Sequence, residues 1–184
     1  MFEINLVIFV LGTILIVWVS RSSLRDANSH GFYRFFAWET ILIMFVLNST
    51  YWFRDPFSFH QIIAWTLLII SLVLIFQGVK LFRKKGNIDE ERTDPTLVGI
   101  EKTTELVTTG LYKYIRHPFY SSLLFLAWGI VFKRILWYEI LLAIITTVFL
   151  ILTVKKEEVE NIEFFGEKYR EYMKNTKMFI PYVL

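Results

Sequence analysis

The residues best suited to chemistry lie in two short stretches of the C-terminal half. The first runs from Leu106 to Tyr120, reads LVTTGLYKYIRHPFY, and places Arg116 and His117 directly before Pro118. Proline suits the first turn of a helix, where its missing N–H leaves no hydrogen bond unmade. The free N–H groups of such a helix start, with a guanidinium beside them, favour an anion such as a carboxylate or phosphate. An interfacial arginine within a belt of tyrosines explains the same residues equally well.

The second stretch begins at Lys155 and contains two neighbouring carboxylates, Glu157 and Glu158, about one turn past an apolar run. From that position one carboxylate can face back toward the helix that starts at Pro118. Such a carboxylate is able to bind an ammonium or a sulfonium-bearing amino acid. A solvated helix face is the alternative interpretation.

Several common chemistries are excluded by what the sequence lacks. The chain contains no cysteine, which excludes disulfide scaffolds, thiolate zinc sites, iron–sulfur clusters and cysteine nucleophiles. No two of its 8 glycines are close enough to form a phosphate loop or a dinucleotide fingerprint. His30, His60 and His117 form no pair at helical spacing, so no metal site is expected, and no serine elbow motif is present.

The elements that position these stretches are predicted to be membrane helices. The chain of 184 residues is 55% hydrophobic with a mean hydropathy of +0.48, which is more apolar than an ordinary soluble domain. Five segments come near the roughly 20 apolar residues that a spanning helix needs. The sequence therefore predicts an all-α integral membrane protein with about five transmembrane helices, the last two forming a helical hairpin. The predicted segments are 4–19, 35–53, 59–76 with an extension to 82, 120–132 and 135–154.

A single domain, residues 1–184, is expected to have four parts. Residues 1–82 hold three spans, 83–117 a cytoplasmic connector, 118–154 the hairpin, and 155–184 a helical cytoplasmic tail broken at Gly166. Of the 20 lysines and arginines, 17 fall on the side of the connector and tail and 3 on the other side. Because cytoplasmic loops carry the excess of positive charge, the N-terminus is expected outside and the tail in the cytoplasm. The excess of basic residues is thus interpreted as a result of membrane topology and of attraction to the lipid bilayer, not of nucleic-acid binding.

Together the two stretches resemble the isoprenylcysteine carboxyl methyltransferase family, including its bacterial members, and the related phospholipid methyltransferases. The resemblance covers roughly residues 104–181 and is carried by LVTTGLYKYIRHPFY, a helical hairpin, the pair EE, FGEKYREYMK and a closing FIP. The first three spans match only as hydrophobic segments. The resemblance implies a membrane enzyme that transfers a methyl group from S-adenosyl-L-methionine to a lipid-like or isoprenoid substrate.

The resemblance also implies a cofactor site between the loop before the fourth span and the tail after the fifth. It assigns cofactor binding to Thr104, Glu105, Leu106, Val107, Tyr112, Arg116, His117, Pro118, Phe119, Tyr120 and Glu157. Glu157 is expected to take the ammonium group of the cofactor. No general base is assigned, because a sulfonium methyl is already activated and needs mainly a well-placed nucleophile in a dry pocket.

Three further positions bear on the site: Thr104 on the cofactor contact, and Thr153 and Glu39 on the substrate. Thr104 stands where histidine is common in the family, and Thr153 stands where carboxyl methyltransferases carry an arginine for the substrate carboxylate. The change at Thr153 favours a neutral or amine-bearing lipid, or an isoprenoid, over a prenylcysteine carboxylate. Glu39 is a second weak candidate for substrate contact, because ionisable groups within spans are usually functional. Anchoring near the interface is the alternative role of Glu39, because it is expected to lie only about one turn inside the start of its helix.

Two other functions fit parts of the sequence. A membrane sterol or lipid reductase resembles the C-terminal arrangement but uses NADPH, and its 2′-phosphate would need the cluster Arg83, Lys84 and Lys85. A non-enzymatic membrane scaffold would leave the aromatic and basic residues with a purely topological role. Nothing in the sequence points to a particular oligomeric state.

Overall fold

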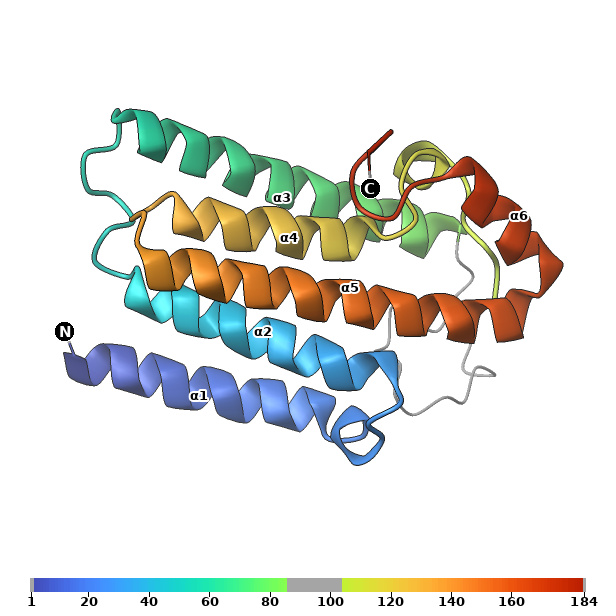
Figure 1. Cartoon of the computed structure of the whole chain (residues 1–184), viewed down its shortest axis with the longest axis horizontal. Coiled ribbons are helices and arrows are strands. Elements are labelled where there is room, and N and C mark those ends of the chain that lie inside the picture. The colour runs from blue at the N-terminus through green and yellow to red at the C-terminus, as the bar shows by residue number, and fades with distance from the viewer. Residues whose placement is uncertain (1, 86–103, 184) are drawn as a thin grey trace.

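The computed structural model describes residues 2–85 and 104–183. Five helices lie side by side, and a sixth, shorter helix packs at one end of the bundle (Figure 1). They are α1 (Phe2–Ser20), α2 (His30–Leu47), α3 (Phe59–Lys85), α4 (Pro118–Val131), α5 (Trp137–Phe165) and α6 (Glu167–Asn175). Within the described ranges there is no strand, and Ile115 and Lys177 form an isolated bridge. The predicted all-α fold is confirmed.

Two helix pairs form the body of the bundle: α3 packs along α4, and α2 packs along α5. Gly129 of α4 allows close packing, because a Cβ built there would lie 3.0 Å from the Leu68 side chain of α3. The Ser71 hydroxyl of α3 also donates to the Ser122 carbonyl of α4 at 2.7 Å. The remaining long helix, α1, packs on the outer side of α2.

The interior between the central helices is filled mainly by apolar side chains, and a polar contact between α2 and α5 lies within it. There the hydroxyls of Thr40 and Thr146 lie 2.8 Å apart. One buried apolar cluster contains Ala37, Tyr120, Leu124, Leu150, Val154 and Phe179, and the other contains Ile41, Met44, Ala127, Ile130, Val131 and Ala143. Both clusters join residues of α2, α4 and α5, so these three helices share one core.

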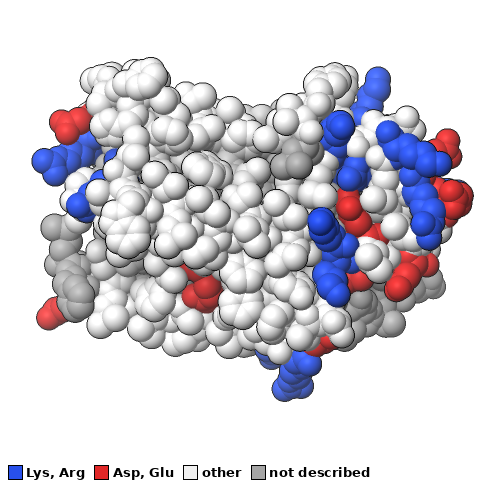
Figure 2. All heavy atoms as spheres, in the orientation of Figure 1, with Lys and Arg blue, Asp and Glu red and all other residues white. Residues whose placement is uncertain are grey.

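The outer surface suits a lipid environment. The helices α1, α3 and α5 are long and apolar enough to cross a bilayer. Figure 2 shows a broad uncharged belt, with most charged side chains gathered at the two ends of the molecule. The chain is therefore an integral membrane protein. The helix α2, which carries Arg34 and Glu39, and the shorter α4 are not among these three helices, so five spans stay a prediction. The orientation of the termini stays a prediction as well.

The start of α2 differs from the sequence-based expectation. The helix begins at His30, five residues before Phe35, because the Ser29 hydroxyl caps it by accepting a hydrogen bond from the Phe32 N–H at 3.3 Å. Polar residues near this start suggested a loop, but His30 is fully buried. Glu39 accordingly lies in the middle of α2, and the expectation that it lies close to the helix start is wrong.

The fifth helix is longer than expected. It continues without interruption to Phe165, eleven residues past the predicted end of the hairpin at Val154. The predicted break at Gly166 is confirmed, and this residue adopts φ +63° and ψ −136°, a backbone conformation that glycine tolerates best. The carboxylates Glu157 and Glu158 therefore lie on the same rigid helix as the apolar stretch.

The short length of α4 creates the space in which the candidate site lies. It has 14 residues, against 27 in α3 and 29 in α5. At 1.5 Å per residue, it is about 20 Å shorter than its neighbours. The turn between α4 and α5 is tight, so the missing length falls at the other end, where Pro118 packs against Gly78 of α3. The segment before α4, the helix α6 and the residues after it fill this end.

Candidate active site

A pocket opens at the end of the bundle where α4 begins. Its empty volume is about 670 Å³ counted to the open mouth. The end of α3, the segment before α4, α4 itself, α5 and α6 contribute its walls. The lining residues are Phe82, Glu105, Leu106, Val107, Tyr112, Arg116, His117, Phe119, Tyr120, Glu157, Asn161, Phe165, Tyr169 and Tyr172. Aromatic rings therefore make up much of the wall.

The structure brings together most of the residues assigned to the cofactor from the sequence. Nine of those eleven line the pocket: Glu105, Leu106, Val107, Tyr112, Arg116, His117, Phe119, Tyr120 and Glu157. Thr104 instead lines a neighbouring depression that extends along α6. Pro118 occupies the first turn of α4, as predicted, and contacts Gly78. The role of these residues in cofactor binding stays a prediction.

The two weak substrate candidates lie outside this pocket. Glu39 faces α1, where it accepts a hydrogen bond from the Thr13 hydroxyl at 3.1 Å. Thr153 is fully buried on α5, and its hydroxyl donates to the Phe149 carbonyl of its own helix at 2.7 Å. Both side chains thus serve contacts between or within helices.

Sequence reasoning missed five residues that line the pocket: Phe82, Asn161, Phe165, Tyr169 and Tyr172. A signal for two of them was present. Asn161 and Phe165 follow Glu157 at intervals of four residues, which places all three on one face of a continuous helix. Treating the chain after Val154 as a separate tail hid this spacing.

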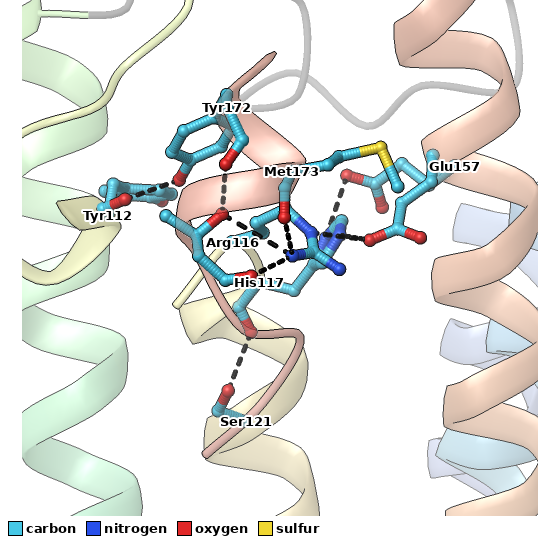
Figure 3. A network of polar contacts seen from close by, with 9 residues as sticks. Tyr112, Arg116, His117, Ser121, Glu157, Tyr172 and Met173 are labelled. Atoms are coloured by element: carbon cyan, nitrogen blue, oxygen red, sulfur yellow. Dashed lines mark hydrogen bonds and ion pairs between the residues drawn. The ribbon is translucent and has the colours of Figure 1, made fainter. Parts of the chain in front are cut away.

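Arg116 joins the segment before α4 to α5 and to the chain after α6. Its Nε donates to Glu158 Oε1 at 2.7 Å, and its Nη1 donates to the carbonyls of Met173, at 3.2 Å, and Thr176 (Figure 3). The side chains of Arg116 and Glu158 are each only 9% exposed. The Arg116 backbone N–H also donates to the Lys177 carbonyl at 2.8 Å. Since charge-assisted hydrogen bonds are strong when screened from water, Arg116 fixes the wall of the pocket.

His117 lies between the two carboxylates of α5. Its Nδ1 is 3.6 Å from Glu157 Oε1, and its Nε2 is 3.4 Å from Glu158 Oε1. Burial alone would lower the pKa of the His117 imidazole, but the hydrogen bonds and charges of both carboxylates outweigh burial and raise it. His117 therefore tends to hold its proton, which suits a structural link better than a general base.

The Glu157 carboxylate lines the pocket and can accept hydrogen bonds there. One of its oxygens, Oε1, faces His117, and the other, Oε2, is buried without a hydrogen-bond partner among the residues that the structure describes. An ionised carboxylate can only accept hydrogen bonds, and a buried acceptor without a donor costs free energy. A donor such as an ammonium would satisfy this oxygen.

Tyrosines close the side of the pocket toward α6. The Tyr172 hydroxyl donates to the Tyr112 carbonyl at 2.6 Å, and the Tyr112 ring stacks on Phe82 with centroids 5.7 Å apart. Burial raises the pKa of Tyr112, Tyr169 and Tyr172, so their hydroxyls stay protonated. These residues supply flat apolar faces and neutral hydroxyls, a wall suited to a heteroaromatic ring.

Two alternative ligands find less support in the described part of the chain. No group of three or more potential metal ligands occurs in residues 2–85 and 104–183. Arg83 and Lys84, which a 2′-phosphate would need, line an open depression along α3 and not the pocket. The side chain of Lys85 lies outside the described part of the structure.

Comparison with known proteins defines the class of this membrane protein. The family described as phospholipid methyltransferase matches residues 59–168, more than half of the chain, and the chain belongs to this family. The resemblance to isoprenylcysteine carboxyl methyltransferases noted in the sequence is confirmed by this match and by the relatives below.

The individual relatives are named as methyltransferases, and this chain aligns with only part of the length of each. The chain is 35% identical over 74 residues to a methanethiol S-methyltransferase of Pseudomonas deceptionensis, covering 40% of this chain and 28% of the relative. It is 33% identical over 87 residues to methanethiol S-methyltransferase 1 of Bradyrhizobium diazoefficiens, covering 47% and 30%. It is 31% identical over 118 residues to protein-S-isoprenylcysteine O-methyltransferase B of Arabidopsis thaliana, covering 61% and 58%. No solved structure gives a significant match.

Proposed function

We propose that this chain is an S-adenosyl-L-methionine-dependent membrane methyltransferase that acts on a lipid-like or isoprenoid acceptor. Membership of the phospholipid methyltransferase family supports the reaction class. The observation that carries the proposal is the Glu157 carboxylate, which has one buried acceptor oxygen in a pocket walled by aromatic rings. When bound, the cofactor supplies an activated methyl group, which the acceptor takes while the electrons of the broken C–S bond stay on sulfur.

The residues of the pocket have distinct roles in this proposal. Glu157 receives the ammonium of the cofactor, and Leu106 and Val107 provide backbone groups beside the nucleoside. Tyr112 packs against the cofactor. Phe119, with the neighbouring rings, excludes water, which strengthens each electrostatic contact in the site.

Arg116 and His117 act as positioning residues in this scheme. Arg116 ties the segment before α4 to Glu158 and to the chain after α6. His117 lies against both Glu157 and Glu158 and holds the carboxylates in place. Neither residue needs to touch the transferred methyl group.

The pocket disfavours an anionic acceptor. Among its lining residues, Arg116 is the single permanently charged cation, and Glu158 occupies its Nε. Thr153 offers no positive charge for a carboxylate, since its hydroxyl bonds to its own helix. The relatives are named for methanethiol and for an isoprenylcysteine, both of which join sulfur to apolar groups. We therefore include thiols with neutral lipids, amine-bearing lipids and isoprenoids as candidate acceptors.

The cofactor assignment is tested by isothermal titration calorimetry on the full chain in detergent. S-adenosylhomocysteine should bind, and NADPH should not. Glu157→Gln should weaken binding about 30-fold or more, because loss of one partner of a desolvated charge pair costs about 2 kcal/mol at least. The matched control is Glu163→Gln, an exposed carboxylate on the same helix, which should keep wild-type affinity. Equal affinity of wild type and Glu157→Gln would refute the assignment of this pocket.

The acceptor is tested separately with methyl-labelled cofactor. Membranes containing the chain are incubated with the label, and the lipid extract and the volatile fraction are counted. Label in the lipid extract supports a lipid acceptor, and label in the volatile fraction after addition of methanethiol supports a small thiol. Cofactor binding without label in either fraction would overturn the acceptor classes proposed above while leaving the cofactor assignment intact.

A further inference from the structure

A second polar cavity lies at the end of the bundle opposite the candidate active site, where the α2–α3 connection meets the α4–α5 turn (Figure 1). It has about 630 Å³ of empty space counted to its open mouth. Arg54, Lys133 and Arg134 line it, His60 lies beside them, and Asp55 is the acidic residue of its wall. The cavity therefore carries a net positive charge.

The guanidinium groups of this cavity are held over one aromatic ring. The guanidinium carbon (Cζ) of Arg134 lies 4.4 Å from the ring centroid of Tyr51, and that of Arg54 lies 5.9 Å from it. Asp55 Oδ2 approaches Arg54 Nε at 3.7 Å, but both side chains are well exposed, so this ion pair is weak and does not neutralise the cavity. Planar guanidinium groups carry a fork of donors that suits a phosphate.

Lys133 contributes positive charge to the wall of the cavity. It is 1% exposed, and its Nζ donates to the Trp52 carbonyl at 3.2 Å and to Gln61 Oε1 at 3.0 Å. The ammonium also lies 3.4 Å from the centroid of the Trp65 ring. Because these contacts fix the ammonium, direct binding of a ligand falls to the two arginines.

An apolar groove adjoins the cavity and shares Tyr51 and Arg134 with it. Its apolar walls come from α1 and α2, and its empty volume is about 770 Å³ counted to the open mouth. The apolar lining residues are Leu6, Phe9, Val46 and Leu47. A cationic cavity and an apolar groove thus meet at one arginine, an arrangement that fits a phosphate joined to a hydrocarbon chain.

Exposed aromatic side chains place this end of the bundle at the level of lipid headgroups. Phe53, Phe57, Phe59 and Trp137 are 79%, 90%, 80% and 76% exposed. Tryptophan is enriched at the boundary between the hydrocarbon core and water, and exposed phenylalanine rings beside it suit the hydrocarbon side of that boundary. The phosphates of surrounding lipids lie at the same boundary, within reach of arginine side chains that extend from the bundle.

We propose that this end of the bundle binds one anionic phospholipid, with its phosphate at Arg54 and Arg134 and an acyl chain in the groove between α1 and α2. The bound lipid covers the groove between these two helices and so stabilises the packing of α1. It lies at the opposite end of the bundle from Glu157, so it is not the methyl acceptor. The site goes beyond the proposed activity and does not depend on it.

The test measures lipid retention by the full chain. Protein is reconstituted in nanodiscs of phosphatidylcholine with one-fifth phosphatidylglycerol, extracted with mild detergent, and weighed by native mass spectrometry. Wild type should retain one phosphatidylglycerol. Arg54→Gln with Arg134→Gln should lower retention about 30-fold, since each surface cation contributes about five-fold to the attraction of an anionic lipid. The control, Lys113→Gln with Arg170→Gln, removes two exposed cations at the other end and should retain the lipid.

Three outcomes would overturn the proposal. Retention that is unchanged in the Arg54 and Arg134 variant would show that the arginines do not hold the lipid. An equal loss in the Lys113 and Arg170 control would show a general effect of net charge. Stabilisation of the detergent-purified protein by inorganic phosphate to the same extent as by phosphatidylglycerol would assign the cavity to a free anion.

Discussion

Arg116→Ala should be among the most destabilising substitutions outside the apolar core. The change removes the donor to Glu158 Oε1 at 2.7 Å and two donors to backbone carbonyls. It also leaves the 9% exposed Glu158 carboxylate with the His117 ring, at 3.4 Å, as its cationic neighbour among the described residues. Breaking a buried ion pair by removing one partner costs about 3–5 kcal/mol, and we expect a loss of that size in the free energy of unfolding.

The assay is equilibrium unfolding in mixed micelles titrated with sodium dodecyl sulfate, followed by loss of helicity. Arg116→Lys should lose less than Arg116→Ala, because it retains the charge but not the fork of donors. Arg170→Ala is the matched control, since Arg170 and Glu167 are 3.6 Å apart and are 56% and 80% exposed. That exposed pair should contribute less than about 1 kcal/mol. The reasoning is refuted if Arg116→Ala and Arg170→Ala destabilise the protein equally.

Two further substitutions test the electrostatics and the backbone of the same region. His117 has a raised pKa in the folded protein, so its stabilising effect is complete below the unfolded value of about 6.5 and is lost as pH rises through the raised value. Within that window, unfolding titrations should show wild type losing about 1.4 kcal/mol per pH unit relative to His117→Gln, and parallel pH profiles would contradict the expectation. Gly166→Ala should cost about 1–3 kcal/mol, because φ +63° is strained for alanine while open space around the Cβ removes any steric contribution. The same unfolding titration measures it against Lys168→Ala, an exposed change on α6, and an equal cost for the two would contradict the strain argument.

Much of the fold follows from the distribution of apolar residues, because a bilayer demands long apolar helices. The first helix, predicted as 4–19, is found as Phe2–Ser20, and the extension of the third past Phe76 is confirmed. The start of α2 could not be predicted in this way. His30 hydrogen bonds through Nδ1 to Glu160 Oε2 at 2.6 Å, a partner 130 residues away that no local pattern indicates.

The site was predicted as far as it depends on local motifs. The order of Arg116, His117 and Pro118 indicated a helix start, and α4 begins at Pro118. Arg116 was expected to favour an anion, but its partners were not predicted. Glu158 and the Met173 carbonyl approach it only when α5 and α6 pack around the segment. Long-range packing of this kind depends on helix length, which composition alone does not fix within a turn or two.

The unbroken length of α5 has a mechanical consequence. The helix α5 runs without a break from the α4–α5 turn, beside the exposed Trp137, to the carboxylates of the pocket. From Trp137 to Glu157 the helix rises about 30 Å, so a tilt of about 5° would move the carboxylate by almost 3 Å relative to the turn. Bilayers of different thickness impose tilts on spanning helices, and methyl transfer tolerates little displacement between reacting atoms. If the pocket carries the proposed methyl transfer, activity should therefore depend on the acyl-chain length of the host membrane.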